Sequence, residues 1–518
     1  MSVPPARLVA VLACTGIVTA AAAAAPPNVP VAQGGGALAG VRLALDPGSS
    51  NRLVAVYWDD QRDRRGTCSI ALSSDRGATW TSRPFAGPGS DNLLPPGASL
   101  CRDPAVAFGR DRTLYVAYAA ARLSGFAQVE LVRSTDGGAS FGAPVLLDPD
   151  AAGGGDREPS IVAGKAGRVV VSFQRYSEDE GSAAVAVVSS GDGGRTFSAP
   201  VAVSPPEQNA AGSRAALALD AAGTLYAGWV DGSGVDLDDG GGTAAIVVAA
   251  SRDGGLSFES PRTVTEVPGG CGPSADCGNR YPAVSLAAPS AGRVVTAWSA
   301  GAFPDPARIS TARSTDGGRR WTAPKTLAPL TGSDDRDQYE PDASAAPDAR
   351  VDLVFLDQAR DADNGLVDVE HAHSVDGGKT FSRPVRLDET PLITQVGDVS
   401  PAAAVASSNA SAAVVWSVGD VFFAARADSA PPRAPLVRGS LVVRAGRPAV
   451  YRLSATDGFT PAAALRFLCG IDAAPLRRCA ARLALRLPPG PHVLRVRAVD
   501  AAGNRSVPTR VLVRVSSR

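Results

Sequence analysis

The sequence predicts an all-β protein in which a β-propeller is followed by a small β-sandwich. Two observations lead to this fold class. The pattern Ser-X-Asp-X-Gly-X-X-aromatic occurs six times at a spacing of about sixty residues, and a fixed period of this size is typical of a repeat architecture. Short apolar runs separated by Gly, Asp and Ser turns fill the space between the copies, without any helical period, as expected for four short strands in each propeller blade.

The repeated pattern has the residues of a tight turn. In each copy the aspartate can accept hydrogen bonds from backbone amides, and the glycine two positions later tolerates a positive φ. We expect the six aspartates to be structural. The copies are Ser73–Trp80, Ser134–Phe141, Ser190–Phe197, Ser251–Phe258, Ser314–Trp321 and Ser374–Phe381, with the aspartates Asp75, Asp136, Asp192, Asp253, Asp316 and Asp376.

These six copies resemble the Asp box, or BNR repeat, of the sialidase-like β-propellers, and the resemblance covers residues 40–425. It implies a propeller fold and a secreted, sialidase-like glycoside hydrolase (of the exo-α-sialidase type) or a divergent relative acting on extracellular glycans. Asp boxes also occur in propellers with other functions. The alternative is therefore a non-catalytic propeller that binds a glycan or a protein at the cell envelope.

The number of first strands differs from the number of Asp boxes. The last repeat unit has three strand-like runs and no Asp box, and a stretch near residues 28–32 could supply its missing strand and close the ring. The sequence thus favours seven blades, with six as the alternative. The expected first strands begin near Val41, Pro104, Pro159, Ala215, Pro282, Pro341 and Pro401.

The N-terminal segment predicts export. Arg7, an apolar run and a small-residue region ending at Ala25 match a signal peptide over residues 1–25. A membrane anchor and a lipoprotein cleavage before Cys14 are the alternatives. The mature protein would be secreted or associated with the cell envelope. The net charge of zero gives no electrostatic indication of a nucleic-acid partner, and nothing in the sequence requires an oligomer, so we expect a monomer.

The propeller is expected over residues 26–430 and a separate sandwich over residues 434–518. In the sandwich, residues 495–504 look like the terminal hairpin of bacterial immunoglobulin-like modules. An even number of cysteines in an exported chain favours disulfides over zinc. The expected pairs are Cys68 with Cys101, Cys271 with Cys277, and Cys469 with Cys479.

Propeller geometry separates the Asp boxes from a site. The Asp boxes join the third and fourth strands, whereas the first strands start at the opposite face. Three of those starts carry an arginine just before an acid or tyrosine and a proline. Guanidinium groups converging there could bind a carboxylate bidentately, although salt bridges between blades would explain the same pattern. The arginines are Arg102, Arg157 and Arg280.

The resemblance to sialidases implies roles for residues at this face. Arg102, Arg157 and Arg280 would bind the substrate carboxylate. Tyr339 with Glu340 would be the nucleophile pair, and Asp60 the acid. The sequence departs from the family at the first blade, where Gly40-Val41-Arg42 replaces its Arg-Ile-Pro motif.

No cofactor and no metal centre is expected. His371 and His373 alternate onto one strand face, but two histidines are too few for zinc, and we expect them at the strand surface. Acidic loops could hold structural calcium, although solvated acids are the alternative. These loops contain Asp231, Asp236, Asp238, Asp239, Asp361, Asp363 and Asn364.

Overall fold

The computed structural model describes residues 28–517 apart from short gaps, of which the longest are 270–281, 329–336 and 394–401. Its regular structure consists of strands, as expected from the sequence. Among the described residues there is no helix of the length and apolar character that a membrane span requires.

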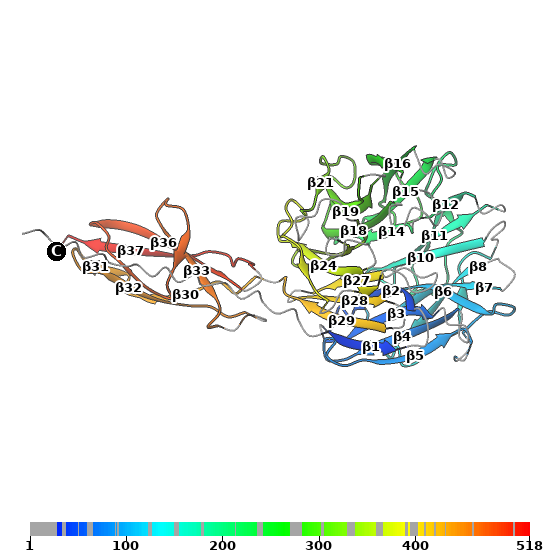
Figure 1. Ribbon diagram of the computed structural model, residues 1–518, viewed down its shortest axis with the longest axis horizontal. Coiled ribbons are helices and arrows are strands. Elements are labelled where there is room, and N and C mark those ends of the chain that lie inside the picture. Colours follow the sequence, from blue (N-terminus) through cyan, green and yellow to red (C-terminus); the bar gives the residue numbers. More distant parts are fainter. Residues whose placement is uncertain are drawn as a thin grey trace, which may run out of the picture.

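Within residues 29–427, the described chain forms seven antiparallel sheets, and in six of them the strands follow one another along the chain (Figure 1). The first three sheets contain β2 (Leu38–Leu45), β3 (Leu53–Asp59), β4 (Thr67–Ser73) and β5 (Thr81–Ala86); β6 (Leu100–Phe108), β7 (Leu114–Ala121), β8 (Ala127–Ser134) and β9 (Val145–Leu146); and β10 (Gly155–Ala163), β11 (Val169–Tyr176), β12 (Ala183–Ser190) and β13 (Val201–Ala202).

The next three sheets contain β14 (Ala216–Leu219), β15 (Leu225–Val235), β16 (Gly242–Ser251) and β17 (Arg262–Pro268); β18 (Ala283–Ser290), β19 (Arg293–Ala300), β20 (Arg308–Ser314) and β21 (Lys325–Thr326); and β22 (Gln338–Ala345), β23 (Val351–Asp357), β24 (Leu366–Ser374) and β25 (Val385–Arg386), with β26 (Leu392–Ile393) also pairing with β24.

The last sheet joins the two ends of this region. It consists of β27 (Ala402–Ser407), β28 (Ala412–Val418), β29 (Val421–Ala427) and, as the outermost strand, β1 (Val29–Gln33). The antiparallel pairing of β1 with β29 confirms the expectation that residues near 28–32 complete the last unit. The first strands of neighbouring sheets contact one another in a closed cycle: β2, β6, β10, β14, β18, β22, β27 and again β2. The arrangement is therefore propeller-like.

Strand register places the repeated turns at one end of the sheets. In the first sheet Leu38 pairs with Asp59, whereas Leu45 pairs with Leu53 and Leu53 with Ser73. The turn that follows Ser73 therefore lies at the end away from the start of β2. In all six copies the serine hydroxyl donates to the aspartate and accepts the N–H of the following glycine. These contacts support the structural role expected for the six aspartates.

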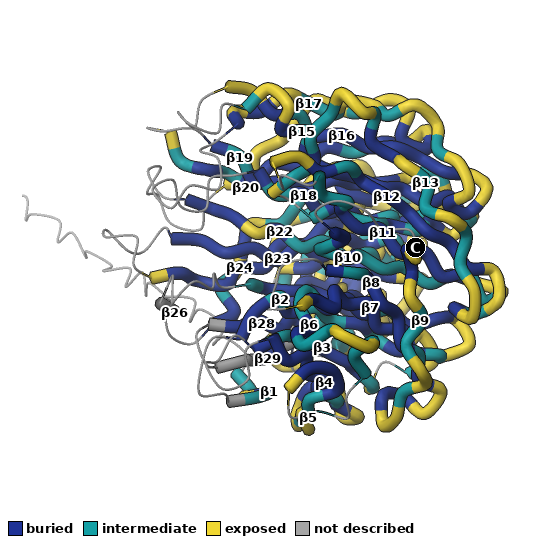
Figure 2. The backbone as a smooth tube through the Cα atoms, turned by 90° about the vertical axis from the view of Figure 1, so that its right-hand side faces the viewer, coloured by how far each residue is buried: buried dark blue, intermediate teal, exposed yellow. Residues whose placement is uncertain are grey.

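The core lies between neighbouring sheets. Val54, Ile70 and Phe85 of the first sheet pack against Val116 and Tyr118 of the second. Both faces of the middle strands are therefore buried, which explains their nearly continuous runs of Val, Ala and Ile. Figure 2 shows these strands as buried segments that end in exposed turns.

Residues 436–516 form a second, separate body with two sheets (Figure 1). One sheet has the order β30 (Leu436–Gly439), β32 (Ala449–Ser454), β35 (Arg482–Leu485); the other has β31 (Val442–Arg444), β37 (Thr509–Ser516), β36 (Gly490–Val499), β33 (Arg466–Ile471), β34 (Arg477–Cys479). Tyr451 and Leu453 of the first sheet share one core with Phe467, Val496 and Val513 of the second.

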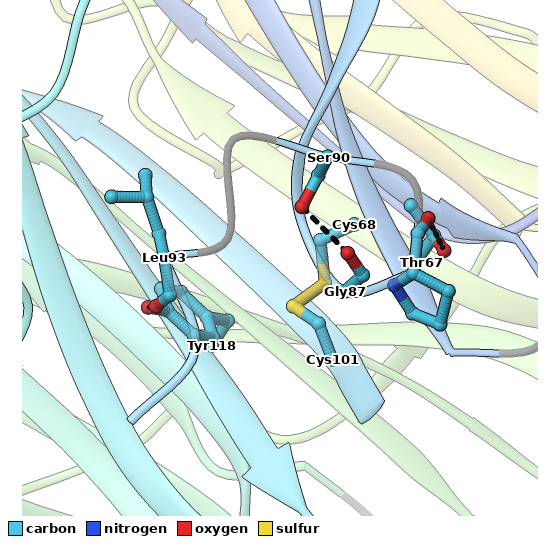
Figure 3. Close-up of a disulfide and its surroundings, with 8 residues drawn as sticks. Thr67, Cys68, Gly87, Ser90, Leu93, Cys101 and Tyr118 are labelled. Atoms are coloured by element: carbon cyan, nitrogen blue, oxygen red, sulfur yellow. Dashed lines mark hydrogen bonds between the residues drawn. A yellow bond between two sulfur atoms is a disulfide. The ribbon is translucent and has the colours of Figure 1, made fainter. Parts of the chain in front are cut away.

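Two of the three expected disulfides are present. Cys469 and Cys479 join β33 to β34 with their Cα atoms 5.8 Å apart. Cys68 and Cys101 join β4 to β6, and thus two neighbouring sheets, with their Cα atoms 5.4 Å apart (Figure 3). Cys271 and Cys277 lie outside the described residues.

Replacement of both Cys68 and Cys101 by alanine is expected to lower the free energy of unfolding by about 3–4 kcal/mol, because the bridge closes a loop of 33 residues in the unfolded chain. Thermal unfolding of the oxidised double variant measures the loss. Under reducing conditions, which break the Cys469–Cys479 bridge in both proteins, the wild type and the variant should melt at the same temperature; equal stability of the oxidised wild type and the oxidised variant would contradict the prediction.

The repeated turns should make folding stability depend on acid pH. Hydrogen bonds, the largest from the Ser257 hydroxyl, lower the pKa of Asp253 from 3.8 to about 2. A lowered folded-state pKa contributes stability above about pH 4 that is lost as the pH falls toward 2. We expect Asp253→Asn to melt about 1–2 °C below the wild type at pH 6 and the difference to shrink toward pH 2. Asp305→Asn is the matched control and should show no such convergence.

Candidate functional site

A charged pocket of about 330 Å³ opens at the end of the inner strands opposite the repeated turns. Seven sheets contribute to its wall, because their first strands converge there. Its ionisable side chains are Arg42, Asp103, Glu158, Arg214, Tyr339, Glu340 and Asp342. A narrower hollow of about 170 Å³ is also lined by all seven inner strands and shares Arg42 and Asp342 with the pocket.

A shared distortion of the inner strands turns acids into this pocket. The register shifts between Arg102 and Ala105 in β6, and equivalent shifts occur in β2, β10 and β22. At each shift one residue has a positive φ: Gly40 at 59°, Asp103 at 51°, Glu158 at 55° and Glu340 at 51°. Positive φ is costly for residues other than glycine and clusters at functional sites. At this position β6, β10 and β22 each hold an acid in the strained conformation, whereas β2 has a glycine, for which positive φ is not strained.

The same bulges leave Arg102 and Arg157 outside the pocket wall. The Arg102 guanidinium lies over the Trp58 ring, 5.4 Å from its centroid, and that of Arg157 lies over Tyr176 at 4.9 Å. Cation–π contacts of this kind fix the guanidinium on a neighbouring ring. The guanidinium groups that do line the pocket belong to Arg42 and Arg214.

Of the residues that the sequence proposed for catalysis, Tyr339 and Glu340 line the pocket. The Tyr339 ring is almost fully buried against Leu356 and Trp416, and its hydroxyl has no hydrogen-bond partner among the described residues. Burial, followed by the charge of Glu340, raises the pKa of Tyr339. Asp60 and Arg280 lie outside the described residues.

Burial controls the protonation of the acids. It raises the pKa of Glu158 from 4.5 to about 7, assisted by the charge of Asp103 and opposed by Arg214. Burial also raises the pKa of Glu340 and of Asp342, with Arg42 opposing both shifts. The Glu340 side chain is nevertheless exposed to the solvent of the pocket, so its shift is weaker evidence than that of Glu158.

Three polar atoms of residues that line the pocket are buried without a hydrogen-bond partner in the described chain: Glu158 Oε2, Arg214 Nη1 and the Tyr339 hydroxyl. Burial, followed by repulsion from Arg42, lowers the pKa of Arg214 to about 10. Buried polar atoms normally find a partner. The three atoms therefore have hydrogen-bonding capacity left for a ligand that enters the pocket.

Sequence reasoning named Tyr339 and Glu340 but assigned no role to Arg42, Asp103, Glu158, Arg214 or Asp342. The repeated acid-proline pair in β6, β10 and β22 was the available signal. Sequence reasoning assigned the binding role to the arginine that precedes this pair, whereas the bulge turns the acid itself toward the pocket. Arg214 precedes the short β14 and has no repeated neighbour that would mark it.

The larger opening at the other end of the inner strands is a weaker candidate. This opening of about 680 Å³ is lined by loops between first and second strands. Its wall contains four basic side chains but one carboxylate, Asp220. That carboxylate already accepts hydrogen bonds from Gly292 and Thr224.

The histidine pair is not at the strand surface, which corrects the expectation. His371 and His373 do share one face, with ring centroids 5.8 Å apart, but both are buried. His371 Nε2 lies 3.0 Å from Asp352 Oδ1, and the same carboxylate bonds Arg350 at 3.4 Å. The pair belongs to a buried ion network of β23 and β24.

The described residues contain one cluster that could hold a metal ion. Carboxylate oxygens of Asp428, Asp457 and Asp500 lie within 4.8 Å of one another, where the chain passes from the seven sheets to the second body. Oxygen ligands of this kind suit calcium. Of the acidic loops named for calcium, Asp231 accepts N–H groups of Asn209 and Ser233, and the other residues lie outside the described part of the chain.

No known protein-family profile matches the chain, and no curated protein matches it. Solved structures similar to it include a polysaccharide lyase, the ulvan lyase PL25, with 13% identity over 78% of this chain and 96% of the lyase, at a TM-score of 0.47. A protein of unknown function from Dyadobacter fermentans has 17% identity, coverage of 64% and 93%, and a TM-score of 0.43. NanB sialidase from Streptococcus pneumoniae has 11% identity, coverage of 94% of both chains and a TM-score of 0.37. At these TM-scores the similarities assign no function to the pocket.

The pKa of Glu158 predicts a measurable effect on stability. Because the folded-state pKa is raised, the protonated acid contributes stability at low pH that is lost as the pH rises from about 4.5 through about 7. We expect Glu158→Gln to melt at the wild-type temperature at pH 4 but about 1–3 °C above it at pH 8. A Tm difference that does not change between these pH values would contradict a buried, proton-holding Glu158.

Proposed function

We propose that this protein is an exported glycoside hydrolase whose site is the pocket at the mouth of the inner strands. In this proposal the seven sheets are the seven blades of an Asp-box β-propeller, and the second body is an immunoglobulin-like module. The observation that carries the proposal is the half-buried group of Glu158, Asp103 and Arg214 in the pocket wall, where burial raises the pKa of Glu158 to about 7.

Most glycoside hydrolases use two carboxyl groups in different protonation states. Glu158 is the candidate acid, because a pKa of about 7 keeps a useful fraction protonated at neutral pH. It would donate its proton to the glycosidic oxygen as the bond to the anomeric carbon breaks. Asp103, whose charge acts on Glu158, is the candidate partner: its carboxylate would stabilise the developing positive charge and assist the attacking water.

The two arginines would position the substrate. Arg214 Nη1 is a buried donor without a partner in the described chain, and a sugar hydroxyl or carboxylate could accept its hydrogen bond. The wall carries four carboxyl groups against the two guanidinium groups of Arg42 and Arg214. This balance favours an uncharged sugar over an anionic one.

The exo-α-sialidase type is the second candidate, favoured by the Tyr339 hydroxyl that is buried next to Glu340 in the pocket wall. Tyr339 would be the nucleophile, Glu340 its base and Asp60 the acid. The substrate carboxylate would require Arg102, Arg157 and Arg280 to turn into the pocket, or Arg42 and Arg214 to replace them.

The remaining proposals concern the protein as a whole. Residues 1–25 would be removed on export, and the two disulfides suit an oxidising compartment. The partner would be an extracellular glycan or glycoconjugate, and the protein would act as a monomer without a cofactor apart from structural calcium. A non-catalytic propeller that binds a glycan or protein is the outcome if no hydrolysis is found.

A panel of fluorogenic aryl glycosides, including a sialoside, tests the proposal on the full chain. We expect turnover of an uncharged glycoside, with kcat reduced on the order of 10²–10⁴-fold in Glu158→Gln because the general acid is lost. Glu266→Gln, an exposed glutamate of β17, is the matched control and should keep wild-type activity. Tyr339→Phe should change kcat little.

The outcomes separate the candidates. Turnover of the sialoside that disappears in Tyr339→Phe would replace the carboxylate mechanism by the sialidase type. Turnover that survives unchanged in Glu158→Gln would remove Glu158 from the mechanism. If the protein binds a glycan but turns over no member of the panel, the non-catalytic, glycan-binding propeller is the remaining candidate.

A further inference from the structure

The net charge of the chain is zero, but positive and negative charges are unevenly distributed between residues 1–430 and residues 431–518. Residues 431–518 contain 16 arginines and three aspartates, with no lysine or glutamate. Since the whole chain has 51 basic and 51 acidic residues, this module has a net charge of +13 and residues 1–430 have −13. Such an asymmetry indicates an anionic partner for the basic part, which the total charge alone does not reveal.

Three of these arginines form a row across the outer face of the three-stranded sheet. Arg438 of β30 pairs with Arg452 of β32, and Arg452 pairs with Arg482 of β35. All three are exposed. Directly opposed residues in antiparallel strands have Cβ atoms about 5 Å apart, and like charges at this distance destabilise the sheet. The row therefore works against folding.

No acid of the module compensates this row. Of its three aspartates, Asp457 and Asp500 belong to the carboxylate cluster near Asp428, and Asp472 bonds His492 on the other sheet. Among the described residues, the three arginines form no salt bridge. Arg486, also exposed, extends the basic face at one side and donates to the Gly446 carbonyl.

The other side chains of this face are small or aliphatic. Leu436, Val450, Ser454 and Ala484 surround the row, and the described aromatic rings of the module, Tyr451 and Phe467, point into its core. The face thus lacks the aromatic platforms on which single-stranded nucleic acids stack and the Trp or Tyr anchors of membrane interfaces. A flat strip with evenly spaced guanidinium groups instead fits an extended chain with repeating anions.

We propose that the three-stranded sheet of the module binds a linear anionic polysaccharide, whose carboxylate or sulfate groups are held by Arg438, Arg452 and Arg482. Each guanidinium can take such a group through two parallel hydrogen bonds. The bound anions would also remove the repulsion among the three arginines. The module would then hold the protein on an anionic polymer, whereas residues 1–430 have a net negative charge. This inference does not depend on the proposed hydrolase activity.

The experiment measures retention of the full chain on immobilised heparin and on immobilised polygalacturonate, with neutral dextran as the blank. We expect the wild type to bind both anionic polymers. The triple variant Arg438→Gln, Arg452→Gln, Arg482→Gln should bind them at least about tenfold more weakly than the wild type does. The Tm of the variant should be equal to or above that of the wild type, because like charges have been removed. A purely structural row would instead lower the Tm.

A second triple variant separates the row from total charge. Arg444→Gln, Arg477→Gln and Arg478→Gln remove three exposed charges from the other sheet and should change binding less than about threefold. An equal loss in both variants, or none in the first, would overturn the proposal. So would stronger binding to phosphatidylglycerol vesicles or duplex DNA than to the polysaccharides, or self-association of the chain that the first variant abolishes.

Discussion

The pairing of β1 with β29 is the interaction on which the rest of the structure depends. It joins the N-terminal strand to the last sheet, so that seven sheets contact one another in a closed cycle and few sheet edges stay open. Closure brings the first strands to a common axis. Residues from positions as distant as Arg42 and Ala403 thereby line one pocket. A site of this composition exists only after the chain has closed.

The closed cycle of seven sheets places the starts of the first strands around a common axis. The bulges in these strands determine which of their side chains face that axis. In β6, β10 and β22 a residue with positive φ precedes a proline, a conformation that costs about 1–3 kcal/mol for residues other than glycine. The surrounding pairs of the ladder hold this strain. Its consequence is electrostatic, because the charges of Asp103 and Glu340 act on the half-buried Glu158. The strain and the raised pKa of Glu158 therefore arise from the same local geometry.

Sequence patterns were sufficient for the features that depend on local chemistry. The six Ser-X-Asp-X-Gly turns and the Cys469–Cys479 pair, whose members are 10 residues apart, each follow from residues close in the chain. The pocket could be predicted only in part. Tyr339 and Glu340 lie at the start of the first strand β22, and the catalytic roles expected for them stay predictions. The orientation of Arg102 and Arg157 depends instead on a one-residue bulge and on rings of neighbouring strands, which periodicity does not encode.

Total charge failed as a guide for a related reason. The sum over the chain gives zero, whereas the fold separates an acidic body of seven sheets from a basic second body with its own core. Electrostatic attraction acts over about 10 Å at moderate salt, so a partner meets the charge of one body and not the average of both. The acids that line the pocket and the arginines that cross the three-stranded sheet therefore lie in separate bodies. A polymer bound by these arginines need not be the substrate of the pocket.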